Sequence, residues 1–174
     1  DVADVADRFA IPAAEGVRLL VMGGVQNAGT GCLCPEYTLI STILASTGYF
    51  PDEVILLDTP AGLEHFGRAV AEGFEYALIV TDESYNARAV ARDLSRLARQ
   101  CSIRQVILVV NRVRNGLEKP DIIGEMEGLF QKVWLLPHDS CITRHEPSVI
   151  PAVLDHCPIV GNIESLAGYI LAHC

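Results

Sequence analysis

The chain has 174 residues, of which half are hydrophobic and a fifth are charged, and its formal net charge is −9 at pH 7. This composition indicates a folded, acidic protein and excludes a disordered one. It also argues against a nucleic-acid partner, because phosphates attract clustered lysine and arginine. No apolar run approaches the roughly 20 residues of a membrane-spanning helix, so no membrane span is expected. The length suits a single domain over residues 1–174.

Apolar runs rich in β-branched residues alternate with helix-like segments along the chain. Residues 1–15 show little periodicity and predict an irregular lead-in. The predicted strands cover 17–23, 53–58, 76–82, 103–111 and 132–137, and the predicted helices cover 35–46, 63–72, 84–100, 120–130, 148–156 and 162–172. Continuous apolar strands between helices are typical of an α/β fold with a doubly wound, mostly parallel sheet and helices on both faces.

Polar residues follow each predicted strand. They occupy residues 23–34, 58–62, 82–84, 111–115 and 137–140. Open α/β sheets bind ligands at the carboxyl ends of their strands. The sequence therefore predicts one functional edge of the sheet.

A glycine-bearing loop, GVQNAGTG at residues 24–31, follows the first predicted strand. Its glycine spacing imitates a Walker A phosphate loop, which continues with a lysine and then a serine or threonine. Thr30 and Gly31 occupy those positions here. We therefore expect a connector, and the chain as given lacks the element that grips the phosphates of a nucleotide.

The stretch EVILLDTPAG, residues 53–62, places Asp58 at the end of an apolar run. A Walker B aspartate is presented to Mg²⁺ in this way. Gly62 gives conformational freedom to a turn whose backbone could sense a γ-phosphate. The alternative is an ordinary strand-to-helix turn in which Asp58 is only a polar terminator.

Cys32 and Cys34 form a Cys-x-Cys pair. Cysteines two residues apart do not easily form an unstrained disulfide, whereas two thiolates can bind a soft metal ion. Two thiolates leave a tetrahedral ion half-coordinated, so the same pair from the second subunit of a homodimer would complete a Cys₄ site. Pro35 fits the first turn of a helix, whose amino terminus lowers the pKa of nearby thiols. Ni²⁺ and Zn²⁺ both suit such a site, and loop thiols without a ligand are the alternative.

Three further cysteines are expected to be reduced and buried or half-buried, because a domain of this size does not need disulfides to be stable. They are Cys101, Cys141 and Cys157. The reduced state would suit a cytoplasmic protein. The histidines show no recurring ligand spacing, and we expect them at surface or core positions.

The stretch DTPAGLEHFGRA, residues 58–69, resembles the switch segment of MinD/ParA-like P-loop ATPases. Within that branch it looks like the CooC family, the ATPases that help to insert nickel into carbon monoxide dehydrogenase. MGGVQNAGTGCLCPEYTLI, residues 22–40, is similar to that family's Cys-x-Cys segment, and VVNRVRN, residues 109–115, resembles its strand with a base-reading asparagine. The resemblance extends over residues 7–151.

The resemblance implies a P-loop NTPase-like fold and a cytoplasmic homodimer that binds ATP with Mg²⁺. It implies roles for Asp58 at the magnesium ion, Gly62 in the phosphate-sensing turn and Asn111 at the adenine. It further implies that Cys32 and Cys34 bind nickel, with zinc as a substitute, and that the client is a metalloenzyme such as carbon monoxide dehydrogenase.

Family members begin with a Walker A loop and its strand, which this sequence does not contain. We therefore expect the carboxy-terminal part of such an ATPase, unable to hydrolyse ATP by itself. One alternative is a non-catalytic α/β module that dimerises through structural zinc and docks a partner protein. A thiol redox protein that uses Cys32 and Cys34 is a further alternative.

Overall fold

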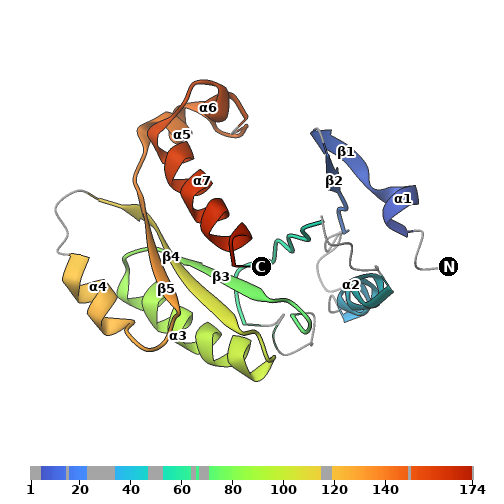
Figure 1. Cartoon of the computed structure of the whole chain (residues 1–174), viewed down its shortest axis with the longest axis horizontal. Helices are drawn as coiled ribbons and strands as arrows, with labels where there is room; N and C mark the ends of the chain where they lie inside the picture. Colours follow the sequence, from blue (N-terminus) through green and yellow to red (C-terminus); the bar gives the residue numbers. More distant parts are fainter. Residues whose placement is uncertain are drawn as a thin grey trace, which may run out of the picture. The chain divides into compact units, whose positions relative to one another are not determined.

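The structure is a computed structural model that describes residues 5–14, 16–22, 34–46, 53–63, 66, 71–114, 119–148 and 150–173. The chain divides into two compact units, Asp1–Val70 and Ala71–Cys174. Figure 1 colours the units from blue at the amino terminus to red at the carboxyl terminus. The expectation of one domain over residues 1–174 stays a prediction.

The carboxy-terminal unit is built on a parallel sheet of three strands in the order β3-β4-β5 (Figure 1). The strands are β3 (Tyr76–Thr81), β4 (Gln105–Val113) and β5 (Lys132–Pro137). They confirm the predicted strands at 76–82, 103–111 and 132–137. Each is a continuous apolar run, as expected for strands of a covered parallel sheet.

Helices connect and cover these strands. They are α3 (Tyr85–Gln100), α4 (Lys119–Glu125), α5 (Ser140–His145), α6 (Ile150–Leu154) and α7 (Pro158–Leu171). Right-handed crossovers in the order β3-α3-β4-α4-β5 place α3 and α4 on the same face of the sheet. Figure 1 shows α7 on the other side of the strands. The predicted α/β class, with helices on both faces of a parallel sheet, is confirmed.

The central strand β4 is buried on both of its faces. Ile107 and Val109 belong to a buried cluster that includes Ile159 and Leu166 of α7. Leu108, whose side chain alternates to the opposite face, is also fully buried. This double burial explains why residues 106–110 form an uninterrupted apolar run.

Several helix boundaries differ from the predicted ones. The helix predicted over 120–130 ends at Glu125, and residues 126–129 form turns in which Gly128 has a φ of 75°. The helix predicted over 162–172 begins earlier, with Pro158 in its first turn, where a missing N–H costs no hydrogen bond. The helix predicted over 148–156 is the short α6, and α5 was not predicted.

The amino-terminal unit contains α1 (Val5–Phe9), β1 (Ile11–Ala14), β2 (Val17–Leu19) and α2 (Cys34–Ser46). The two strands pair antiparallel, and Gly16 in the connection has a φ of 74°. The irregular lead-in predicted for residues 1–15 is therefore wrong over the described residues 5–14, and the parallel strand predicted over 17–23 is wrong over the described residues 17–22. The three residues of β2 are exposed, so they form half of a short hairpin instead of a core strand. The helix predicted over 35–46 is confirmed.

The strand predicted over 53–58 is wrong. Residues 53–60 contain no regular secondary structure, and the side chains of Val54 and Leu56 are 62% and 86% exposed. Among the described residues no strand pairs with this segment, and an apolar run needs hydrogen-bonded neighbours to form a strand. The described residues of the helix predicted over 63–72 contain no α-helix either.

In the part of the chain that the structure describes, none of the helices combines the length and the apolar character that crossing a membrane requires.

Candidate functional site

The carboxyl ends of β3, β4 and β5 lie at one edge of the sheet because the three strands are parallel. Three of the five predicted polar clusters meet there: residues 82–84 after β3, 111–113 at the end of β4, and 138–139 after β5. The clusters at 23–34 and 58–62 belong to the other unit. Three of the five clusters thus share one edge of the carboxy-terminal unit, and the function predicted for that edge stays a prediction.

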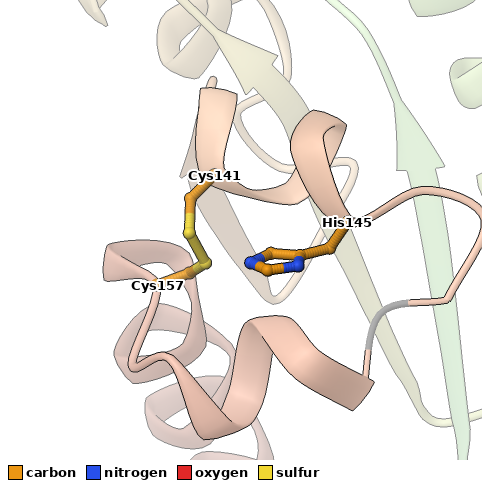
Figure 2. Close-up of side chains that lie close together, drawn as sticks. All are labelled: Cys141, His145 and Cys157. Atoms are coloured by element: carbon orange, nitrogen blue, oxygen red, sulfur yellow. A yellow bond between two sulfur atoms is a disulfide. The ribbon is translucent and has the colours of Figure 1, made fainter.

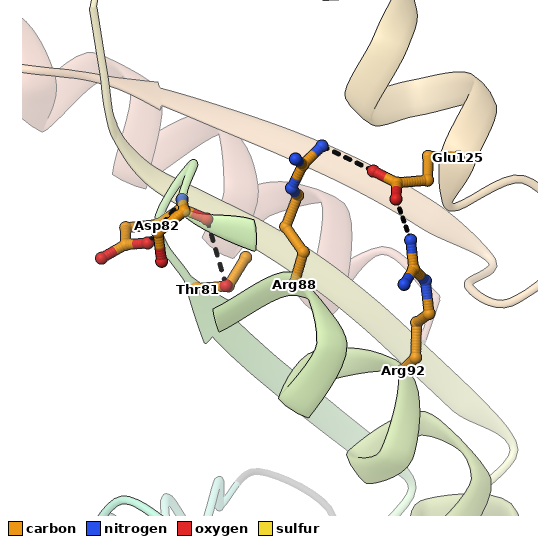
Figure 3. A network of polar contacts seen from close by, with 6 residues as sticks. Thr81, Asp82, Arg88, Arg92 and Glu125 are labelled. Carbon is orange, nitrogen blue, oxygen red and sulfur yellow. Dashed lines mark hydrogen bonds and ion pairs between the residues drawn. The ribbon is translucent and has the colours of Figure 1, made fainter. Parts of the chain in front are cut away.

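Asp82 is an exposed carboxylate that follows β3. The backbone N–H of Ser84 donates to Asp82 Oδ1 at 2.8 Å. Hydrogen bonds from the Ser84 side chain and backbone, with the Arg112 charge as a smaller cause, lower the pKa of Asp82. Ser84 Oγ in turn accepts from Ala87 N–H at 3.3 Å and caps α3. The turn thus keeps a charged carboxylate at the edge of the sheet (Figure 3).

The end of β4 contains a local irregularity. Arg112 has a φ of 58°, and the pairing of β4 with β5 shifts register between Val110 and Val113. A bulge of this kind re-aims side chains and is common beside functional sites. Asn111 is half-buried there, and its Oδ1 accepts the Arg112 N–H at 2.9 Å. The amide of Asn111 is thereby fixed in orientation at the sheet edge.

Asp139 joins the end of β5 to two helices. Its Oδ2 accepts from Ile159 N–H at 3.0 Å and its Oδ1 accepts from Cys141 N–H at 2.8 Å. These two bonds, the Ile159 bond first, lower the pKa of Asp139, and the nearby charges of Arg144 and His138 act in the same direction. The amino termini of α5 and α7 are thus held together. The sequence contained one sign of this role, an aspartate directly before a helix, where capping residues stand.

An ion-pair network joins the two crossover helices on one face of the sheet (Figure 3). Glu125 of α4 accepts hydrogen bonds from both Arg88 and Arg92 of α3, the first at 2.5 Å. The three side chains are between 19% and 32% exposed. Because they are largely shielded from water, these pairs are stronger than freely exposed ones. The network fixes α4 beside α3, the helix that Ser84 caps.

The two predicted phosphate-side residues lie in the amino-terminal unit. Asp58 is exposed in the irregular segment 53–60, so no strand delivers it as the Walker B pattern predicted. Gly62 is half-buried in a bend and has a φ of 129°, which side-chain-bearing residues rarely adopt. The structure thus accounts for glycine at position 62. The roles of Asp58 at Mg²⁺ and of Gly62 in sensing phosphate stay predictions.

The Cys-x-Cys pair lies mostly outside the described residues. Cys32 is not among the described residues. Cys34 is the first residue of α2, but the structure describes only its backbone. Pro35 stands in the first turn of α2, as predicted. The metal site and the dimer that would complete it stay predictions.

The cysteines of the carboxy-terminal unit correct one prediction. Cys141 and Cys157, expected to be reduced, form a disulfide across a sequence separation of 16, with their Cα atoms 5.8 Å apart (Figure 2). The hydrogen bonds of Asp139 to both helix starts bring the two cysteines together. Cys101 is half-buried, as predicted, and burial, followed by the charge of Glu72, raises the pKa of its thiol.

The sequence interpretation also missed a ligand spacing. Cys141 and His145 are four residues apart, and residues at that spacing share one face of a helix. Both lie on α5, and Figure 2 shows the imidazole of His145 pointing toward the disulfide. The spacing was visible in the sequence, but the helix that makes it meaningful was not predicted.

Comparison with known proteins finds relatives, although no family model matches the chain. The chain is 33% identical over 157 residues to an uncharacterized ATP-binding protein of Methanocaldococcus jannaschii, covering 89% of this chain and 60% of that protein. It is 32% identical over 139 residues to the carbon monoxide dehydrogenase accessory protein CooC of Rhodospirillum rubrum, covering 80% of this chain and 52% of CooC. A second uncharacterized ATP-binding protein of M. jannaschii is 28% identical over 130 residues, or 75% of this chain and 51% of that protein. The chain therefore spans between half and two thirds of these relatives, and its resemblance to CooC-type proteins is confirmed.

Proposed function

Because this chain is a homologue of CooC and of archaeal ATP-binding proteins, we propose that it is part of an accessory ATPase that handles nickel for the maturation of carbon monoxide dehydrogenase. The observation that carries the proposal is the match to CooC over 139 residues, 80% of this chain. The stretch DTPAGLEHFGRA and the Cys-x-Cys pair contain the residues that would perform this function. We place the protein in the cytoplasm, where such a client enzyme would be assembled.

Nickel is the cargo in this proposal, and the ligands are Cys32 and Cys34. The start of α2 at Cys34 supports this assignment, because the positive end of a helix favours thiolates over thiols. Two thiolates from one chain supply half of a tetrahedral or square-planar set. A homodimer with the pair on its two-fold axis supplies the other half.

The nucleotide part of the proposal assigns ATP with Mg²⁺ to three residues singled out in the sequence, Asp58, Gly62 and Asn111. Asp58 holds Mg²⁺, the turn at Gly62 responds to the γ-phosphate, and Asn111 contacts the adenine. The fixed amide of Asn111 at the sheet edge supports the last assignment, because an amide can both donate to and accept from a purine edge. The φ of 129° at Gly62 supports a turn that only glycine adopts with ease.

The phosphate loop is assigned to a part of the parent protein that these 174 residues do not include. The relatives are longer, since the chain covers 60% of one and 52% of another. The 174 residues alone would then bind ATP weakly and not hydrolyse it. In the parent protein, residues 1–174 would belong to a single ATPase domain. ATP would clamp two subunits around the nickel ion, and hydrolysis would reopen the site for transfer to the client.

Calorimetric titration of ATP with Mg²⁺ into the full-length parent protein tests this proposal. We expect binding that Asp58→Asn abolishes, because the substitution removes the charge that holds Mg²⁺. Asp93→Asn is the matched control, since Asp93 is an exposed aspartate of α3 that pairs only with its neighbour Arg96 among the described ion pairs. Full-length protein that binds no ATP, or binding that Asp58→Asn leaves unchanged, would contradict the proposal. Absence of ATP binding would favour the alternative of a non-catalytic module that dimerises through zinc.

A further inference from the structure

A second group of soft ligands lies in the carboxy-terminal unit. The Sγ atoms of Cys141 and Cys157 and a ring nitrogen of His145 all lie within 4.8 Å of one another (Figure 2). Cys141 and His145 are half-buried on α5, and Cys157, which precedes α7, is only 2% exposed. None of these residues belongs to the nickel site proposed above.

We propose that Cys141, Cys157 and His145 form a metal site for one thiophilic divalent cation of the Zn²⁺ class, and that the disulfide is the metal-free, oxidised state of the same site. The inference does not depend on the proposed function, because it uses no residue of the Cys-x-Cys pair.

The spacing of the backbone suits both states. A tetrahedral ion with Zn–S bonds of about 2.3 Å holds two sulfurs about 3.8 Å apart and a sulfur and an imidazole nitrogen about 3.6 Å apart. The Cα atoms of Cys141 and Cys157 are 5.8 Å apart, so side-chain rotation suffices to separate the sulfurs once their bond is broken. His145 follows Cys141 by one helical turn and faces the same space. Two thiolates and one imidazole leave one position open.

Asp155 offers an oxygen donor for the open position. Its Oδ2 lies 3.1 Å from Nε2 of His145, and its side chain is 63% exposed. This carboxylate can take the fourth position or yield it to water. When water fills that position and the ring binds the ion through Nδ1, the carboxylate accepts from Nε2–H and orients the imidazole, as carboxylates beside metal-bound histidines do.

The scaffold of the site does not depend on the disulfide. Asp139 accepts backbone hydrogen bonds from Cys141 and Ile159 and so holds the starts of α5 and α7 together. Cys157 is part of the buried cluster around Ile107 and Leu166. The ligands therefore stay near one another when the sulfur–sulfur bond is broken, which lowers the entropy lost on binding an ion.

The interconversion of the two states is a balanced thiol–disulfide exchange. A dithiol reductant gives two electrons and two protons to the disulfide, whose bond breaks to yield the thiols of Cys141 and Cys157, while the reductant becomes a disulfide. The cation then displaces both thiol protons and binds the two thiolates. A small-molecule disulfide reverses the process: it takes two electrons from the two thiolates and two protons from water, is itself reduced to two thiols, and the ion is released.

The test uses the complete chain carrying Cys32→Ala and Cys34→Ala, so that the proposed nickel site cannot contribute. The protein is reduced under nitrogen with a phosphine, freed of reductant and titrated with Co²⁺, whose thiolate charge-transfer absorption reports sulfur ligands. We expect one Co²⁺ per chain, displaced by Zn²⁺, and no binding to the oxidised protein. His145→Ala should weaken binding at least about tenfold, whereas the control His173→Ala should not.

Two outcomes would overturn the inference. One is a reduced chain, still folded by circular dichroism, that binds no Co²⁺. The other is unchanged binding after Cys141→Ser with Cys157→Ser. If the double serine variant fails to fold, His145→Ala decides, because it can be purified with the disulfide intact and reduced afterwards; unchanged affinity then contradicts the site. Failure here leaves the proposed function untouched, since Cys32 and Cys34 are absent from every protein in the test.

Discussion

Reduction of the Cys141–Cys157 disulfide should lower the free energy of unfolding of the carboxy-terminal unit. The bond closes a loop between residues separated by 16 positions. The loop-entropy relation gives a loss of about 10 cal/mol/K for a loop of this size, or about 3 kcal/mol at 25 °C. Cys157 is 2% exposed in the core, and reduction removes no heavy atom from the protein, so no cavity of side-chain size is created. The greater freedom of the unfolded chain therefore accounts for the effect.

Urea unfolding with and without a phosphine reductant measures this difference. Trp134 is the chain's single tryptophan, it lies on β5, and its ring centroid is 6.0 Å from that of Tyr169 of α7, so its fluorescence reports the packing of this unit. A strong chelator keeps metal ions off the reduced thiols. With an m value of about 1–3 kcal/mol/M in urea, the midpoint should fall by about 1–3 M.

The matched control is Cys141→Ser with Cys157→Ser, whose midpoint should not respond to the reductant. Cys101→Ala should respond as the unaltered chain does, because Cys101 is not part of the loop. A midpoint that reduction leaves unchanged, in protein shown by mass spectrometry to have contained the bond, would refute the loop-entropy reasoning.

Three further predictions concern the sheet and its edge. Leu108→Ala should lower the free energy of unfolding, measured in urea, by about 2–5 kcal/mol because it empties a fully buried position. Val80→Ala, at a residue of β3 that is 63% exposed, should lower it by no more than about 0.5 kcal/mol. Equal losses would contradict the assigned core. Ser84→Ala should cost about 1 kcal/mol by uncapping α3 and should raise the pKa of Asp82, measured by NMR, because the hydrogen bonds of Ser84 lower it. Because folding lowers the pKa of Asp82, its stabilising contribution is present at pH values above the ordinary pKa of 3.8 and is lost as the pH falls through the pKa of the folded state. The Ser84→Ala variant should therefore lose less stability in acid than the unaltered chain. An unchanged pKa of Asp82 would argue against the hydrogen bond. Glu125→Gln should cost about 1 kcal/mol, less at high salt, because it weakens two partly shielded ion pairs with α3; a cost that does not vary with salt would contradict an electrostatic origin.

The strands of the carboxy-terminal unit could be predicted because the sequence contains both the apolar run and the neighbours that bury it. The runs at 105–113 and 53–58 look alike in the sequence, yet the first is the buried centre of a sheet and the second exposes Leu56 by 86%. A continuous apolar run indicates a segment able to form a buried strand. It contains no information on whether hydrogen-bonded neighbours are present, so the same pattern gave one correct and one wrong prediction.

Part of the candidate site could be predicted from the sequence, and part of it could not. The rule that ligands lie at strand ends led to Asn111, because it depends only on the strand boundary and the parallel sheet. The bulge with positive φ at Arg112 could not be predicted, since arginine has no preference for that conformation. The disulfide of Cys141 with Cys157 was missed because it depends on a tertiary contact, the two hydrogen bonds that Asp139 accepts from separate helices.

Native mass spectrometry of the reduced, nickel-loaded protein tests the central claim most directly. The proposal predicts one Ni²⁺ per pair of chains, lost together with the metal-bridged dimer in Cys32→Ala with Cys34→Ala. The same ion should be retained in Cys141→Ser with Cys157→Ser, which removes the other thiol pair. Nickel bound equally well after the Cys32 and Cys34 substitutions, or bound only to single chains, would contradict the account.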